Sequence, residues 1–314
     1  MNRTIMMLVS VSVLTLGCLQ ARHSTDVEHI TSKVPEGYYD ASEKQGRMEE
    51  FIYQTEDYLN GKGIITKKAI VYLPYGYDDN DTLTRYNILY LMHGAMGNET
   101  TYLGSQTKPT HLKNMIDHMI ADRMIESLII VAPTIEAGSD YYVSSTTLFD
   151  EELLGYLMAA VESKYHTYAE SVTADGLVAS RSHRAFGGFS AGGTTTWNVF
   201  LNGLSCIKYF MPLSGMMKLP VGEINYDAMA QELADAAKAA GKEFCVFAAT
   251  GTRDVAYEGM NEQIEKMKSL SDVFQFTDKG FNEGNLMYYT VEGNPHDYPY
   301  TYEYIFNGLP LFFD

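Results

Sequence analysis

Short apolar runs alternate with amphipathic segments along most of the chain, and this alternation limits the folds that the sequence can form. The runs that predict strands are residues 68–73, 87–92, 128–132, 183–187, 209–213, 244–249 and 286–291. The segments that predict helices lie near residues 110–123, 151–164, 193–202, 226–240, 257–270 and 300–307. Strands that alternate with helices form a mostly parallel central sheet flanked by helices on both faces. We therefore expect an α/β fold without internal repeats.

The sequence GFSAG at residues 188–192 is a G-x-S-x-G motif. It follows a predicted strand and precedes a predicted helix, which is the setting of a nucleophile elbow. In that turn the serine takes a strained backbone conformation, and the residues two positions away have no room for a Cβ. Ser190 is therefore the candidate nucleophile, and a glycine-rich structural turn is the alternative.

A second motif follows the predicted strand at residues 87–92, where the chain runs into His93 and Gly94. In acyl-transfer sites such a loop supplies one backbone N–H to the developing oxyanion, and the residue after the nucleophile supplies the other. These donors fall on Ala95 and Ala191. The His93 side chain either braces the loop through hydrogen bonds, which we favour, or contacts substrate.

A nucleophilic serine needs a general base and a carboxylate that orients it. His296 is the one histidine downstream of Ser190, on a loop after the last predicted strand. Asp254 follows the predicted strand at residues 244–249, at the edge where open α/β sheets place their sites. We therefore predict a triad of Ser190, His296 and Asp254, with a capping role for Asp254 at the helix near Ala256 as the alternative.

The composition supports a full hydrophobic core and excludes several classes of protein. Of the 314 residues, 46% are hydrophobic and 20% charged, so the chain as a whole is not disordered. The 23 Lys and Arg residues against 40 Asp and Glu residues give a net charge of −17, and no basic stretch occurs. Nucleic-acid binding needs a basic patch, so we expect no nucleic-acid partner.

The cysteines and histidines give no sign of a metal site. Cys18, Cys206 and Cys245 lack metal-ligand spacing, and the eight histidines include no HExxH pair. Cys206 and Cys245 lie in apolar, strand-like surroundings, which favours two small buried hydrophobic residues over a disulfide. We therefore expect no metal and no other cofactor.

The N-terminus has the pattern of an export signal. Residues 5–19 form an apolar run behind Arg3, which is short for a membrane span but suits the hydrophobic region of a signal peptide. The sequence LTLGC at residues 14–18 is close to a bacterial lipoprotein cleavage site, in which Cys18 becomes the lipidated first residue. Ordinary secretion with cleavage near Ala21 and an uncleaved anchor are the alternatives.

These patterns divide the chain into three parts. Residues 1–21 are predicted to be a signal peptide of the lipoprotein type, and residues 22–46 a polar tether. Residues 47–314 are predicted to form one catalytic domain, because no second set of domain signals occurs. We expect an exported protein, either a cell-surface or periplasmic lipoprotein or a secreted one, that contacts a membrane only through an N-terminal lipid anchor.

With these motifs in the same order, the sequence resembles the feruloyl-esterase-like, or esterase D, group of the α/β-hydrolases. The resemblance spans residues 46–314 and includes AIVYLPYGYD at residues 69–78, LMHG at 91–94, the elbow, GTRD at 251–254 and HDY at 296–298. It implies an α/β-hydrolase fold and hydrolysis of feruloyl or acetyl esters on plant cell-wall polysaccharide, without a metal. The family's catalytic roles fall on Ser190, Asp254 and His296, and its oxyanion donors on Ala95 and Ala191.

Two positions depart from the family pattern, and both bear on the substrate. The glycine-rich loop after His-Gly is here Ala95-Met96, and the aromatic residue two after the base, often Trp, is Tyr298. Tyr141 and Tyr142 are expected in a long loop at the functional edge of the sheet. These two tyrosines, Tyr298 and His93 are the candidate substrate contacts, although ordinary packing is the interpretation we favour for Tyr141 and Tyr142.

The expected function is therefore that of an exported serine ester hydrolase. Its partner would be acylated hemicellulose or an oligosaccharide derived from it, and feruloyl esterase is the first expectation. The alternatives are an acetylxylan esterase, another small-acyl or thioester esterase resembling S-formylglutathione hydrolase, an acyltransferase resembling mycolyltransferases, and a glycan-binding lipoprotein with a disabled hydrolase fold.

Overall fold

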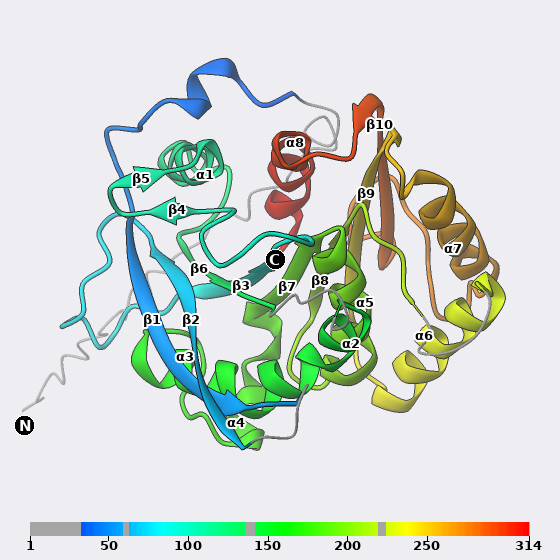
Figure 1. Ribbon diagram of the computed structural model, residues 1–314, viewed down its shortest axis with the longest axis horizontal. Helices are drawn as coiled ribbons and strands as arrows, with labels where there is room; N and C mark the ends of the chain where they lie inside the picture. The colour runs from blue at the N-terminus through cyan, green and yellow to red at the C-terminus, as the bar shows by residue number, and fades with distance from the viewer. Residues whose placement is uncertain (1–32, 59–62, 136–141, 219–223, 314) are drawn as a thin grey trace, which may run out of the picture.

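The computed structural model describes residues 33–58, 63–135, 142–218 and 224–313. Within them an eight-stranded sheet has the order β1-β2-β6-β3-β7-β8-β9-β10 (Figure 1). The strands are β1 (Arg47–Glu56), β2 (Ile64–Leu73), β3 (Asn87–Met92), β6 (Leu128–Pro133), β7 (Arg184–Phe189), β8 (Tyr209–Leu213), β9 (Cys245–Arg253) and β10 (Leu286–Pro295). The expected signal peptide, Cys18 and Ala21 lie outside the described residues.

The strands from β6 to β10 run parallel, and β1 and β2 are antiparallel additions at one edge. All seven predicted strands are present, which confirms the mostly parallel α/β sheet. β1 was not predicted because its buried residues Phe51, Tyr53 and Thr55 alternate with exposed ones. It also missed a two-residue hairpin of β4 (Gly104–Ser105) and β5 (Lys108–Pro109).

Helices cover both faces of this sheet, as predicted (Figure 1). They are α1 (His111–Ala121), α2 (Tyr142–Glu152), α3 (Met158–Lys164), α4 (Ala174–Ala179), α5 (Ala191–Gly203), α6 (Tyr226–Ala240), α7 (Tyr257–Ser269) and α8 (Tyr298–Gly308). The helix expected at residues 151–164 is a continuous path through the end of α2, a π-helical turn at Leu153–Leu157 and α3. The short α4 was not predicted.

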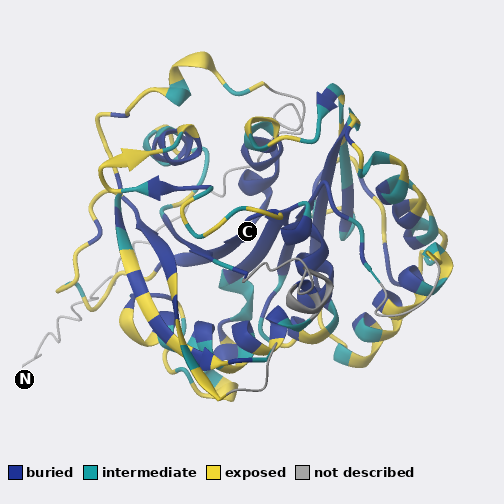
Figure 2. Ribbon diagram, viewed as in Figure 1, coloured by how far each residue is buried: buried dark blue, intermediate teal, exposed yellow. Residues whose placement is uncertain are grey.

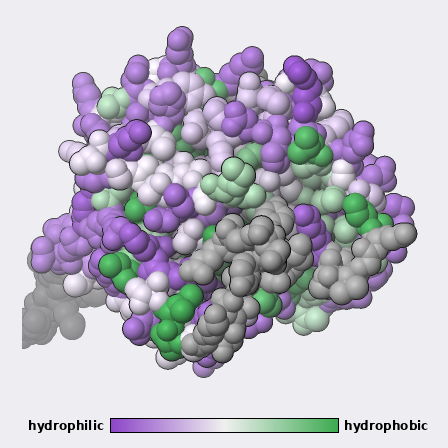
Figure 3. All heavy atoms as spheres, in the orientation of Figure 1, coloured by the Kyte–Doolittle hydropathy of each residue, from purple (hydrophilic) through white to green (hydrophobic). Residues whose placement is uncertain are grey.

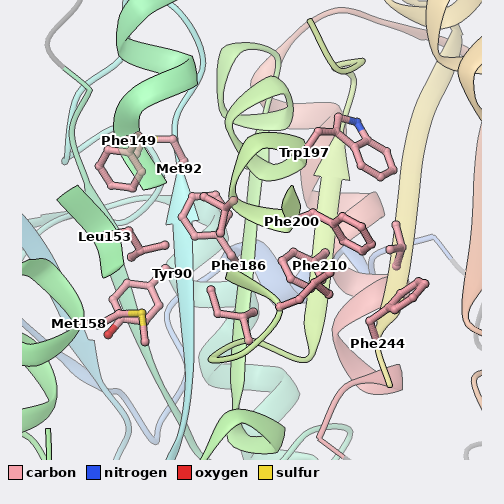
Figure 4. Packing of buried hydrophobic residues seen from close by; sticks show 14 of the residues in the cluster. Tyr90, Met92, Phe149, Leu153, Met158, Phe186, Trp197, Phe200, Phe210 and Phe244 are labelled. Carbon is pink, nitrogen blue, oxygen red and sulfur yellow. The ribbon is translucent and has the colours of Figure 1, made fainter. Parts of the chain in front are cut away.

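Two hydrophobic cores lie on opposite faces of the sheet, because successive strand residues point to opposite sides. Along β3, Ile88 and Tyr90 belong to one core, and Leu89 and Leu91 to the other. The first core packs against α2, α3, α5, α6 and α7, and its aromatic rings gather around Phe200 (Figure 4). The second packs against α1 and α8. Buried residues therefore fill both faces of the central strands (Figure 2).

A buried ion pair fixes the start of β7, the strand that ends at the nucleophile motif. The Arg184 guanidinium donates to both carboxylate oxygens of Glu162, over 2.7 and 2.8 Å. The hydroxyl of Tyr90 donates to the same carboxylate at 3.0 Å. Because this charged pair is bidentate and fully hydrogen-bonded, loss of one partner would leave a buried charge uncompensated.

Residues 33–46, which the sequence analysis assigns to a polar tether, pack against the body of the protein instead. A 3-10 turn at Glu36–Tyr39 lies beside α1, where the Tyr38 ring stacks on His118 at 4.8 Å. The Asn114 amide donates to the Tyr39 carbonyl at 2.8 Å. The polar composition of this stretch concealed two tyrosines that dock on α1 and α8.

The surface and the cysteines agree with the composition. Hydrophilic side chains predominate on the face shown in Figure 3, and the hydrophobic ones form small separate patches. None of the helices in the described ranges is both long and apolar enough to cross a membrane. Cys245 is buried in β9, as predicted, whereas Cys206 is half-buried in the turn after α5, and the described structure joins neither of them in a disulfide.

Candidate active site

Ser190 lies in the tight turn between β7 and α5, near the centre of the sheet. Its φ of 56° and ψ of −111° give the strained backbone that the motif predicts. A Cβ on Gly192 would lie 2.4 Å from the Met92 carbonyl oxygen, and one on Gly188 would lie 2.7 Å from the same atom. The Ser190 N–H donates to the Leu213 carbonyl at 2.8 Å, so backbone contacts hold the turn.

Three side chains at the carboxyl ends of β7, β9 and β10 form one hydrogen-bonded chain. His296 Nε2 lies 2.9 Å from Ser190 Oγ, and His296 Nδ1 lies 2.7 Å from Asp254 Oδ1. Because the ionised carboxylate can only accept, Nδ1 carries the proton and Nε2 is free to take one from the serine. The sequence analysis therefore selected three residues that the structure brings together.

Asp254 is buried, and one of its oxygens contacts both groups that the sequence analysis considered for it. Its Oδ1 accepts from His296 and also from the Ala256 N–H at 2.7 Å, just before α7. The carboxylate thus holds the imidazole and the start of the helix at once.

The end of β10, directly before His296, is tied to β9 by contacts that have no sequence motif. A Cβ on Gly251 would lie 2.0 Å from the Asn294 carbonyl oxygen, so the two backbones touch. The Gly293 N–H donates to Thr252 Oγ1 at 2.9 Å. Phe189, at an unspecified position of the G-x-S-x-G motif, packs its ring 4.5 Å from that of His296. Sequence reasoning missed Thr252 and Phe189 because neither position is marked by its residue type.

The predicted oxyanion loop leaves β3 beside the elbow, since Met92 pairs with Gly188. His93 Nδ1 donates to the Gly94 carbonyl at 2.7 Å, and His93 Nε2 accepts from the Ile135 N–H at 3.2 Å. Both ring nitrogens are used, so His93 braces the loop, the role the sequence analysis favoured over substrate contact. Burial lowers the pKa of His93, which keeps the ring in this neutral tautomer.

The two predicted oxyanion donors are the backbone N–H groups of Ala95 and Ala191. Among the described residues, neither the Ala95 N–H nor the Ala191 N–H has an acceptor. Ala191 is the first residue of α5, where the helix N-terminus favours negative charge. The arrangement therefore combines a candidate nucleophile, a candidate base bonded to a carboxylate, and two candidate backbone donors.

The three tyrosines predicted near the substrate have different positions. Tyr298 directs its hydroxyl at the oxyanion loop, where it accepts from the Gly94 N–H at 2.7 Å. Tyr142 was expected in a loop, and this is corrected because it begins α2. The stretch before Phe149 is polar and lacks the apolar spacing by which a helix is predicted. Tyr141 lies outside the described residues.

Within the parts of the chain that the structure describes, no group of three or more His, Cys, Asp or Glu side chains could hold a metal ion. A serine hydroxyl hydrogen-bonded to an imidazole, close to backbone N–H groups that have no acceptor, suits attack on an ester or thioester carbonyl.

Sequence comparison finds relatives among xylan-degrading enzymes, although no family model matches the chain. The chain is 42% identical over 282 residues to endo-1,4-beta-xylanase Y of Acetivibrio thermocellus, covering 89% of this chain and 24% of that protein. It is 27% identical over 239 residues to an endo-1,4-beta-xylanase/feruloyl esterase of Xylanibacter ruminicola, covering 73% of this chain and 27% of that protein. The chain thus spans about a quarter of the length of these relatives.

Structure comparison finds a close neighbour of similar length. A serine-to-alanine mutant of the feruloyl esterase module from Clostridium thermocellum, complexed with sinapinate, is 40% identical, with a TM-score of 0.77. The match covers 90% of this chain and 93% of that one. A CE1 ferulic acid esterase from the fungus Anaeromyces mucronatus and an S-formylglutathione hydrolase from Staphylococcus aureus share the fold, at 18% and 16% identity and TM-scores of 0.62 and 0.56.

Proposed function

Because this chain belongs to the feruloyl esterase family of the α/β-hydrolases, we propose that it hydrolyses feruloyl esters on acylated plant hemicellulose or its oligosaccharides. The observation that carries this proposal is the hydrogen-bonded chain from Asp254 through His296 to Ser190 beside two free backbone donors. The names of the relatives supply the substrate class, since they describe xylanases and feruloyl esterases.

In the proposed reaction each group has one task. His296 Nε2 takes the proton of Ser190 Oγ as the oxygen attacks the ester carbonyl carbon. The carbonyl oxygen becomes negative and is stabilised by the N–H groups of Ala95 and Ala191. The bond between the carbonyl carbon and the sugar oxygen then breaks as His296 protonates that oxygen, which leaves a feruloyl ester on Ser190 and a free sugar hydroxyl. Water that His296 deprotonates releases the acid in a second, equivalent step.

The test compares three esters with the chain expressed from Arg22 onward. We expect strong turnover of methyl ferulate and its loss in the Ser190→Ala variant. Activity on acetylated xylan and 4-nitrophenyl acetate alone would replace the feruloyl substrate with an acetyl one. Retention of most esterase activity by Ser190→Ala would overturn the triad, and no hydrolysis of any ester would favour an acyltransferase or a glycan-binding protein.

We also propose that the chain is exported and anchored through lipid on Cys18. The apolar run at residues 5–19 and the LTLGC sequence support this, as does a polymeric substrate that lies outside the cell. Metabolic labelling with a radioactive fatty acid is expected to mark the unmodified protein and not the Cys18→Ala variant. Processed but unlabelled protein in the medium would indicate ordinary secretion instead.

A further inference from the structure

We propose that Tyr298 is a positioning residue, which holds the oxyanion-binding loop in place and so stabilises the transition state without binding the substrate. The inference rests on the proposed function, because it assigns a task within the same ester-hydrolysing site. It also gives a physical role to the position at which the sequence departs from the family's usual tryptophan.

The contact that carries the inference joins two segments far apart in the chain. The Gly94 N–H donates to the Tyr298 hydroxyl oxygen at 2.7 Å, across 204 residues of sequence. The oxygen reaches into the turn of the loop: a Cβ on Gly94 would lie 3.1 Å from it, and one on Gly97 only 2.8 Å. Glycines at both positions therefore leave space for the phenol.

The phenol is itself held from several sides. Tyr298 is the first residue of α8, and its N–H donates to Asp297 Oδ1 at 2.8 Å. Its ring packs 4.9 Å from Phe189 and meets Tyr102 edge-on at 5.5 Å. Phe189 directly precedes the nucleophile. One ring thus links the elbow and the oxyanion loop, and its hydroxyl cannot swing away without losing these contacts.

Tyr298 and His93 fix two successive peptide groups of the loop. Tyr298 accepts from the Gly94 N–H, and the Gly94 carbonyl accepts from His93 Nδ1 at 2.7 Å and from the Gly97 N–H at 3.1 Å. In a trans peptide the C=O and the N–H point in opposite directions. Hydrogen bonds to the Gly94 carbonyl therefore turn the Ala95 N–H away from the loop interior. In that direction the N–H is open to an oxyanion.

If Tyr298 positions the loop, its loss should lower kcat much more than it changes KM. Preorganised donors act on charge that develops in the transition state, and removal of one whole donor costs about 10²- to 10³-fold in kcat. Tyr298→Phe removes only the support of the loop, so we expect kcat to fall by about 10- to 100-fold. Ground-state binding does not use the developing charge, so KM should change by less than about twofold.

The experiment uses two variants that each lose one hydroxyl from α8. Tyr298→Phe loses the contact with Gly94, whereas Tyr300→Phe loses an exposed hydroxyl two residues further on. We would measure kcat and KM with methyl ferulate and 4-nitrophenyl acetate, the inhibition constant of phenylboronic acid, and the dissociation constant of ferulate. Phenylboronic acid forms a tetrahedral adduct with the serine and places an oxygen where the oxyanion forms.

We expect Tyr298→Phe to weaken the binding of phenylboronic acid by about the same factor as it lowers kcat, and to leave the binding of ferulate unchanged. In Tyr300→Phe all of these quantities should stay unchanged. Unchanged kcat in Tyr298→Phe overturns the inference. A lower kcat with unchanged phenylboronic acid affinity overturns it too. A higher KM and weaker ferulate binding at constant kcat would make Tyr298 a substrate contact, as the sequence first suggested.

A second measurement does not depend on activity. Thermal melts of both variants define a temperature at which each is folded, and all assays are made there. Amide hydrogen exchange at Gly94 should become faster in Tyr298→Phe and stay unchanged in Tyr300→Phe, and equal exchange in both overturns the inference. If the unmodified protein hydrolyses neither ester, the proposed function fails, while the exchange at Gly94 still decides whether Tyr298 holds the loop.

Discussion

The nucleophile elbow at residues 188–192 and the oxyanion loop at residues 93–97 are neighbours in space, yet they are held in different ways. The elbow is fixed by backbone contacts within a few ångströms, such as that of Gly192 with the Met92 carbonyl. The oxyanion loop is fixed by side chains, one from His93 within the loop and one from Tyr298 far along the chain. Close backbone contacts require glycines and so leave a motif in the sequence, whereas a side chain from far along the chain leaves none.

The largest effect on the rate should come from removing the Ser190 hydroxyl while the backbone of the elbow stays unchanged. Ser190→Ala is expected to lower kcat by about 10⁴- to 10⁶-fold, because the acyl-enzyme can no longer form. The melting temperature should stay close to that of the unmodified protein, since the turn is held by backbone contacts. A fall of many degrees would mean that the Ser190 hydroxyl supports the fold, and the comparison between the two regions would then fail.

A Cβ added at Gly192 in the elbow should destabilise the protein. Gly192→Ala would place a Cβ 2.4 Å from the Met92 oxygen and 2.7 Å from the His93 oxygen, both main-chain atoms. We expect the free energy of unfolding to fall by about 3 kcal/mol, measured by urea denaturation. The matched control is Gly155→Ala, whose Cβ would meet only Tyr58 Oη at 3.5 Å and should change stability by less than about 1 kcal/mol.

The side-chain brace of the oxyanion loop should depend on pH. Burial lowers the pKa of His93 below its unfolded value of about 6.5, so its contribution is complete above that value and is lost as the pH falls below it. Unfolding free energies measured between pH 8 and pH 5 should therefore decline on the acid side. His93→Asn should reduce that decline and also lower kcat by about tenfold.

A second histidine separates the effect on pH-dependent stability from the effect on kcat. Burial also lowers the pKa of His183, which lies at the opposite end of β7 from Ser190. His183→Asn should reduce the acid decline and leave kcat unchanged. If it lowered kcat as His93→Asn does, the effect of His93 on the rate could not be assigned to the oxyanion loop.

The smallest effect should come from the exposed tip of the loop. Met96 has a φ of 62°, which L-residues adopt at a cost, and its side chain is 97% exposed. Met96→Gly should therefore raise the free energy of unfolding by about 0.5 kcal/mol, after the entropy that glycine gains in the unfolded chain is subtracted. The matched change Arg123→Gly, at a φ of 61° far from the site, should stabilise similarly. Only Met96→Gly should alter kcat, and equal kcat in both variants would show that the tip does not support the donors.

The sequence predicted the central strands because parallel strands buried on both faces are continuous apolar runs. It did not predict β1, whose inward residues alternate with charged and polar ones such as Glu50 and Gln54. It placed Ser190, Asp254 and His296 correctly at the ends of strands, because strand order and a single downstream histidine restrict the choice. The sequence suggested Tyr298 as a substrate contact, because Tyr298 and Gly94 are far apart in the chain and only the fold brings them into hydrogen-bonding distance.

The docked segment at residues 33–46 determines how far from a membrane this protein could work. Its contacts with α1 and α8 fix the place where the chain leaves the folded body. If Cys18 carries lipid as proposed, about 15 residues connect it to that place, and an extended chain spans at most about 3.5 Å per residue. The working radius is then about 50 Å, so the enzyme would meet only polysaccharide drawn close to the cell surface.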